Sequence, residues 1–165
     1  MNFSSVVYTT SRSPSPRSRT LVSALAKLTP NSAKLPRGKS SLEQLLASRP
    51  ERCALIVVYE RWGNPAGFRV TFPTGETRSY GFDGVGIARG IKSVLGATRI
   101  GRVVPSQKAP LTRGALALKE FLESFPSSSE PGQLSLNLRS NDTKEVLSLE
   151  AKRVECVSFH FKLRA

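Results

Sequence analysis

The sequence predicts an α/β fold with mixed sheets, arranged as two tandem, similar halves. Helix-spaced apolar stripes alternate with strand-length runs of Leu, Ile and Val, so both kinds of element are expected. Arg37-Gly38 precedes one expected helix, and Arg113-Gly114 opens another 76 residues later. Because 165 residues is the size of one typical domain, we expect a single domain, 1–165, with approximate halves 1–83 and 84–165.

The first half is expected to begin with a strand at 6–9 and a helix that starts at Ser15-Pro16. Ser is a preferred N-cap, and Pro fits the first helical position. The apolar stripe of this helix is Leu21, Ala24, Leu25 and Leu28. A second helix is predicted from Ser40, because Ser40 and Glu43 match the S-x-x-E capping box.

Three strands are expected to complete this half, at 53–60, 68–72 and 77–82. The cluster Gly63-Asn64-Pro65-Ala66-Gly67 between the first two is typical of a turn. The apolar and polar residues of 68–72 alternate, as they do in a strand of a hairpin.

The second half is expected to repeat the order of helix, strand and strand. Val85, Ile87 and Ile91 keep a period of two and favour a strand, whereas residues 112–125 have helical spacing. The apolar stripe of that helix is Leu111, Ala115, Leu118, Leu122 and Phe125. Three further strands are predicted at 133–139, 145–151 and 154–163.

Positive charge dominates the chain, which carries 25 Lys and Arg against 12 Asp and Glu, a net charge of +13. Residues 1–42 and 84–119 contain no acidic residue. A surface adapted only for solubility mixes both signs, so two windows of one sign indicate an anionic partner such as nucleic acid. A transit peptide is an alternative for the first window only.

The cations near the expected helix starts are the candidate phosphate contacts. An acid in the first turn would stabilise a helix, yet basic residues stand at three helix starts, where a phosphate could complement them. Trp62 could stack on a base, or it could fold back on the core. The candidate RNA-binding residues are Arg12, Arg17, Arg19, Lys34, Arg37, Lys39, Arg61, Trp62, Arg89, Lys92, Arg99, Arg102, Lys108 and Arg113.

No catalytic or metal-binding constellation is visible in the sequence. Cys53 and Cys156 stand far apart, and His160 is the single histidine, whereas a zinc site needs about four ligands. We therefore expect buried strand cysteines, a structural histidine, no cofactor and no enzymatic activity. The glycines at 84, 86 and 90 miss the dinucleotide-binding spacing and favour a flexible or bulged strand.

Four segments of the first half resemble the Brix-domain family, in the family's order. They are T-S-R-S-P-S-P-R at 10–17, L-T-P-N at 28–31, R-G-K at 37–39 and E-R-W-G-N-P-A-G at 60–67. Two positions depart from the family pattern: Trp62 stands where a basic residue is common, and Ala66 where Asp is common. The second half matches only loosely, and the chain is most similar to the compact archaeal branch.

The resemblance implies a ribosome-biogenesis factor that binds ribosomal RNA and its precursors and assists their processing without catalysis. It implies two halves, each similar to the anticodon-binding domain of class II tRNA synthetases. Ribosomal proteins or other assembly factors would be partners, with no membrane association. The location would be cytoplasmic, or nucleolar in a eukaryote. The alternatives are an RNA-acting or tRNA-acting enzyme or accessory module with the same basic face, and a protein scaffold with an acidic partner.

Overall fold

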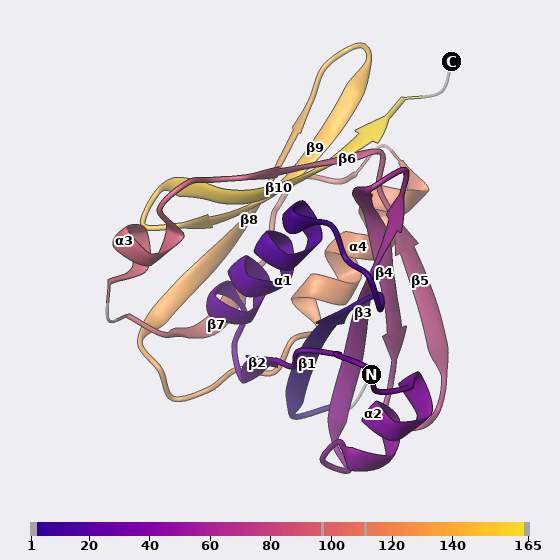
Figure 1. The fold of residues 1–165 in the computed structure, drawn as a ribbon. Helices are drawn as coiled ribbons and strands as arrows, with labels where there is room; N and C mark the ends of the chain where they lie inside the picture. The colour runs from indigo at the N-terminus through magenta and orange to yellow at the C-terminus, as the bar shows by residue number, and fades with distance from the viewer. Residues whose placement is uncertain (1–2, 97, 111, 164–165) are drawn as a thin grey trace.

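Two five-stranded sheets form the structure, a computed structural model that describes residues 3–96, 98–110 and 112–163, the side chain of Lys92 excepted. The first sheet has the order β2-β1-β3-β4-β5 (Figure 1). Its strands are β1 (Ser5–Thr10), β2 (Ser32–Lys34), β3 (Cys53–Arg61), β4 (Asn64–Thr71) and β5 (Thr77–Gly81). β1 runs parallel to β2 and β3, and the other pairs are antiparallel.

The second sheet has the order β6-β10-β9-β8-β7, and only its β7–β8 pair is parallel. Its strands are β6 (Gly84–Ile87), β7 (Ile100–Val104), β8 (Gly132–Ser140), β9 (Lys144–Ala151) and β10 (Val154–Lys162). The described helices are α1 (Pro16–Leu28), α2 (Leu42–Ser48), α3 (Ile91–Leu95) and α4 (Arg113–Glu123). The predicted α/β class with mixed sheets is confirmed.

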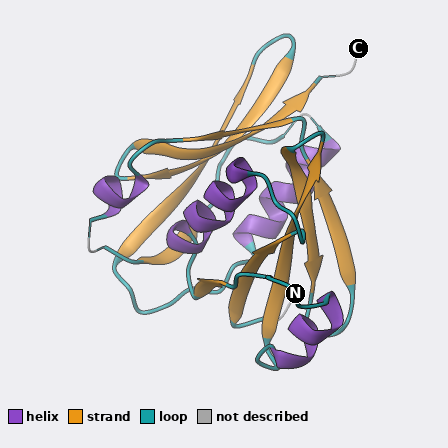
Figure 2. Ribbon diagram, viewed as in Figure 1, coloured by secondary structure: helices purple, strands orange, loops and turns teal. Residues whose placement is uncertain are grey.

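The two long helices, α1 and α4, lie between the sheets and contact both of them (Figure 2). One continuous apolar core joins their buried stripes to the inner faces of the two sheets. Phe68 of β4 and Phe159 of β10 meet edge to face across this core, with ring centroids 5.5 Å apart. The shorter α2 packs Leu45 against Leu55 and Val57 on the outer face of the first sheet. The two halves therefore share a single interior.

Local sequence patterns predicted both long helices and most strands. Ser15 caps α1, Pro16 opens it, and the predicted stripe of Leu21, Ala24, Leu25 and Leu28 is buried. The stripe of α4 is buried from Ala115 to Leu122, with Phe125 beyond its end, whereas Leu111 lies outside the described residues. Cys53 and Cys156 are buried in strands as free thiols, as expected.

The first hairpin turn is tighter than the sequence suggested. The turn consists of Trp62 and Gly63, with φ angles of 50° and 73°, and β4 already begins at Asn64. The Pro65 position falls at a register shift, where a strand tolerates a missing N–H. The prediction of a turn over 63–67 is therefore wrong, because Trp rarely adopts the left-handed conformation that this two-residue turn requires.

Other boundaries also differ from the predictions. The N-cap of α2 is Ser41, with Gln44 as the capping-box partner, one residue later than the predicted Ser40 and Glu43. Ile91 opens α3 instead of extending the strand. The predictions missed β2, β7 and α3, which are only three to five residues long.

The strand orders of the two sheets show which elements of the halves correspond. This correspondence differs from the one that the repeated Arg-Gly pair predicted. In the first sheet β1-β3-β4-β5 follows the order and direction of β7-β8-β9-β10 in the second. The helix after the first strand of each set is α1 in one half and α4 in the other. The pairing of the Arg37-Gly38 helix with the Arg113-Gly114 helix is therefore wrong: α4 corresponds to α1, and α2 is an addition to the first half.

Candidate nucleic-acid interface

At the start of each long helix, the N-cap residue donates hydrogen bonds to a glutamate carboxylate that comes from a strand elsewhere in the chain. The N–H and Oγ of Ser15 donate to Oε1 of Glu60 on β3, at 2.8 and 2.5 Å. The N–H and Oγ of Thr112 donate to Oε2 of Glu145 on β9, at 3.0 and 2.8 Å. Burial by itself would raise the pKa of Glu60, but the hydrogen bonds from Ser15 and Ser18 hold that pKa below its ordinary value. Glu60 therefore stabilises the fold at neutral pH, and this contribution is lost as the pH falls through its lowered pKa.

The first turns of α1 and α4 contain no acid of their own, as the sequence indicated, but carboxylates from elsewhere in the chain lie at both helix starts. Glu60 and Glu145 come from sequence positions far from the helices they cap, and α2 has Glu43 in its own first turn. Backbone hydrogen bonding, Ser41 and two nearby arginines lower the pKa of Glu43, so it is ionised at neutral pH. Because carboxylates already lie at the starts of these helices, the basic side chains rather than the helix termini are the candidates for contact with an external anion.

Of the two carboxylates that cap the long helices, Glu145 is the one whose side chain is completely buried. Glu145→Ala should lower the free energy of unfolding by about 2–3 kcal/mol, since two donors of Thr112 lose their buried acceptor. Urea unfolding followed by circular dichroism measures the change. Glu150→Ala, on the same strand but with Glu150 only partly buried, is the control and should cost less. Equal losses would show that the cap of α4 adds nothing.

Two adjoining hollows between the halves form a cleft at the starts of α1 and α4. Their volumes are about 580 and 370 Å³, and they share Arg61, Ala66, Phe82, Asp83 and Lys162 as lining residues. Arg17 of α1 lines one hollow and Arg113 of α4 lines the other. Four cations and one acid, Asp83, thus surround what we call the inter-half cleft.

The cations of the inter-half cleft come from both halves of the chain. Arg17 reaches from α1 into the second half, where its Nη2 donates to the carbonyl oxygen of Val85 at 2.6 Å. Lys162, at the end of β10, was missed by sequence reasoning, because a single Lys at a strand end has no distinguishing pattern. Its backbone N–H donates to Asp83 at 2.8 Å, which holds this strand end at the junction of the halves.

A third hollow, of about 280 Å³, lies on the other side of α1 and contains four more of the predicted cations. These cations are Arg12, Arg19, Lys34 and Arg37. Leu35 and Pro36 contribute apolar surface to the same hollow. Arg17 and Arg19 point to different sides of α1, because successive residues of a helix turn by about 100°. The start of α1 therefore has predicted RNA-binding residues on both flanks.

The other predicted cations are spread over the surface. Lys39, Arg89 and Lys108 are exposed in loops, and Arg102 is exposed on the edge strand β7. Arg99 lies 4.0 Å from Glu130 beside a separate hollow at the far end of α1. Lys92 lies on α3, but its side chain is outside the described residues.

Trp62 stands at the tip of the β3–β4 hairpin with 92% of its surface exposed. The alternative that it folds back on the core is therefore wrong. It lines one hollow of the inter-half cleft, together with Arg17 and Arg61. A large aromatic side chain thus lies in water beside a group of cations, which is the composition of single-stranded nucleic-acid sites.

Comparison with known proteins finds one decisive relative. A probable Brix domain-containing ribosomal biogenesis protein of Aeropyrum pernix is 36% identical over 124 residues, which cover 71% of this chain and 67% of the relative. This chain belongs to the Brix-domain family. No family model matches the chain.

Solved structures agree with the fold of this Brix-domain chain. A probable ribosomal biogenesis protein from Aeropyrum pernix K1 has a TM-score of 0.70 at 22% identity, covering 98% of this chain and 97% of its own. An archaeal Imp4-like protein called Mil has a TM-score of 0.66 at 24% identity, covering 95% and 96%. At these identities the two structures show a shared fold.

In the hairpin turn of the Brix-domain chain, Trp62 has a left-handed backbone conformation that is energetically unfavourable for a bulky residue. Both turn residues have positive φ, a conformation for which Asn-Gly is the preferred pair. Trp62→Asn should therefore raise the free energy of unfolding by about 1 kcal/mol, as left-handed strain is relieved. Urea denaturation measures it, with Gln133→Asn, at an exposed position of β8, as the control. A loss of stability in Trp62→Asn would mean that the indole packs against the protein.

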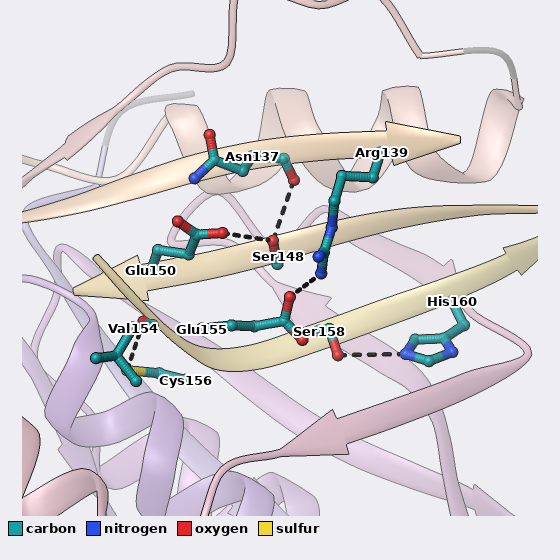
Figure 3. A network of polar contacts seen from close by, with 9 residues as sticks. All are labelled: Asn137, Arg139, Ser148, Glu150, Val154, Glu155, Cys156, Ser158 and His160. Atoms are coloured by element: carbon teal, nitrogen blue, oxygen red, sulfur yellow. Dashed lines mark hydrogen bonds and ion pairs between the residues drawn. The ribbon is translucent and has the colours of Figure 1, made fainter. Parts of the chain in front are cut away.

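The outer face of the second sheet offers a polar network rather than a basic surface (Figure 3). Arg139 pairs with Glu155, and Ser158 Oγ lies 3.2 Å from His160 Nε2. Burial, and after it the positive charge of Lys144, lowers the pKa of His160, which is therefore neutral at pH 7. The ion pair neutralises Arg139, so this face of the Brix-domain chain is a weaker candidate for phosphate than the inter-half cleft.

Among the described residues of the Brix-domain chain, no group of His, Cys, Asp and Glu side chains has the arrangement of a metal site. Burial raises the pKa of the Cys156 thiol, which disfavours the reactive thiolate. No helix in the described part combines the length and the apolar surface that crossing a membrane requires.

Proposed function

We propose that this Brix-domain chain is a ribosome-biogenesis factor that binds ribosomal RNA or its precursors and acts without catalysis. The relatives' names support a role in ribosome biogenesis. The observation that carries RNA binding is the inter-half cleft, where Arg17, Arg61, Arg113 and Lys162 converge from distant parts of the sequence. Convergent cations are the electrostatic footprint of a nucleic-acid site.

The exposure and hydrogen bonding of the cleft cations indicate which of them would contact RNA phosphates. Arg61 and Arg113 are exposed, and neither side chain has a hydrogen bond or ion pair among the described residues. They are therefore available to phosphates, whereas one nitrogen of Arg17 already donates to Val85. The cations of the third hollow, around Arg19, would extend the path of the RNA backbone along α1.

We further propose that residues 1–165 act as one Brix-type domain, with halves 1–83 and 84–165. The shared core supports this, since the inner faces of both sheets belong to one apolar cluster. The partners would be ribosomal RNA and its precursors, with ribosomal proteins or other assembly factors beside them. The compartment would be the cytoplasm, or the nucleolus in a eukaryotic cell.

Crosslinking in cells, followed by sequencing of the bound RNA, tests the proposed function. We expect enrichment at discrete positions of ribosomal RNA precursors, which the Arg61→Glu/Arg113→Glu variant should lose. Lys27→Glu/Arg69→Glu changes the net charge by the same amount and is the control. Lys27 lies at the far end of α1, and Arg69 pairs with Val57 on the outer face beside α2.

Three results would count against the proposal. Crosslinks spread evenly over all cellular RNA would leave a basic protein without a ribosomal target. Crosslinks unchanged in the cleft variant would place RNA elsewhere on the chain. Recovery of an acidic protein without RNA would favour the scaffold alternative instead.

A further inference from the structure

We propose that the hollow beside Trp62 receives one unpaired nucleotide, with its base stacked on the indole and its phosphate among the cleft cations. This inference rests on the proposed RNA-binding function and narrows it. It makes a single-stranded, bulged or flipped-out nucleotide the preferred ligand, over a regular duplex.

The conformation and exposure of Trp62 are the first support for this inference. The side chain is 92% exposed, so it contributes almost nothing to the core. Its φ of 50° is unfavourable for a bulky residue, so turn geometry does not explain it either. Neither folding nor turn formation accounts for a Trp here, whereas contact with an aromatic ligand does.

The shape and polarity of the hollow are the second support. Its volume of about 370 Å³ is at the small end of the range of small-molecule sites, ~300–1,000 Å³. Arg17, Arg61 and Lys162 bring positive charge to it, while Asn64 and Asp83 add polar groups to the lining that Trp62 shares. A space of this kind accommodates a nucleotide, with cations for its phosphate and polar groups for its base edge.

The physics of base stacking selects the form of RNA. In a duplex the face of each base is covered by its neighbours, so an indole reaches it only after the base leaves the stack. Loops, bulges and ends expose base faces, and every base has such a face, so recognition tolerates sequence. The hollow should therefore distinguish RNA by local structure more than by sequence.

The fluorescence of Trp62 provides a direct test, because it is the only Trp of the chain. The full chain is titrated with a short oligouridine, a blunt RNA duplex, and the same duplex with one bulged uridine. We expect the oligouridine and the bulged duplex to quench the emission, and the blunt duplex to bind without quenching. The bulged duplex should bind roughly 5- to 150-fold more tightly than the blunt one, which is the range expected for one base stacked on an aromatic ring.

Variants of Trp62 separate stacking from charge. Trp62→Asn retains the turn and should lose the preference for the bulge, with unchanged affinity for the blunt duplex, measured by anisotropy of labelled RNA. Trp62→Phe retains a ring and should keep most of the preference. Equal affinity of the wild-type chain for both duplexes, or a preference that survives in Trp62→Asn, overturns the inference.

The outcomes also separate this inference from the proposed function. If both duplexes bind equally and with strong salt dependence, RNA binding stands and the nucleotide site is wrong. If none of the three RNAs binds at physiological salt, the proposed function itself fails, and the exposed Trp62 would then point to a protein partner.

Discussion

Phe159→Ala should lower the free energy of unfolding by about 3–5 kcal/mol, the typical loss for a buried Phe. Phe159 is fully buried on β10, and its ring lies 5.5 Å from that of Phe68 and 5.1 Å from that of Phe82. Because Phe68 belongs to the first sheet, the substitution opens a cavity at the junction of the two halves. We therefore expect both halves to lose stability together, in one transition.

Urea unfolding followed by circular dichroism, together with hydrogen exchange of both sheets, measures this effect. Val154→Ala, on the same strand but at an exposed position, is the control and should change stability by less than about 0.5 kcal/mol. If only the second sheet lost protection, or if two transitions appeared, the halves would be separate domains and the proposed single domain would be wrong.

Arg61→Glu/Arg113→Glu should weaken RNA binding and make it less sensitive to salt. Each phosphate contact adds about 0.7–0.9 to the slope of log affinity against log salt, so two lost contacts should lower the slope by about 1.4–1.8. At low salt the loss of affinity should be largest, because counterion release contributes most there. Binding to one RNA over a series of salt concentrations measures both quantities.

The variant Lys27→Glu/Arg69→Glu again serves as the control, since it alters net charge equally at positions away from the inter-half cleft. Its salt slope should remain close to that of the wild-type chain. Equal slopes for the two double variants would mean that the chain binds RNA through its overall charge, and that the cleft is not a specific site.

Sequence patterns predicted the elements whose causes are local. Ser15-Pro16 defines the start of α1 through adjacent residues, and the alternation along the last three strands is visible without tertiary information. The turn at Trp62 was misplaced because a two-residue hairpin requires a left-handed conformation at position 62, which Trp rarely adopts. The pairing of repeated helices was wrong because strand order depends on contacts distant in sequence.

The candidate site was less predictable, for the same reason. Basic windows identified most cations, but their grouping around one cleft depends on the packing of α1 and α4 between the sheets. Glu60 lies 45 residues from Ser15, and Glu145 lies 33 residues from Thr112. No local sequence motif therefore predicts these caps. Lys162 becomes a candidate only when β10 brings it beside Asp83.

The junction between the sheets has a consequence for how an RNA would be received. Only residues 82 and 83 separate β5 from β6, and both flank the inter-half cleft. With so short a connection and a shared apolar interior, the halves have little freedom to hinge open or close. The cleft is therefore preorganised, and the conformational entropy lost on association would fall mainly on a bound RNA. A protein of this kind would act as a rigid template on which a flexible RNA segment takes its shape.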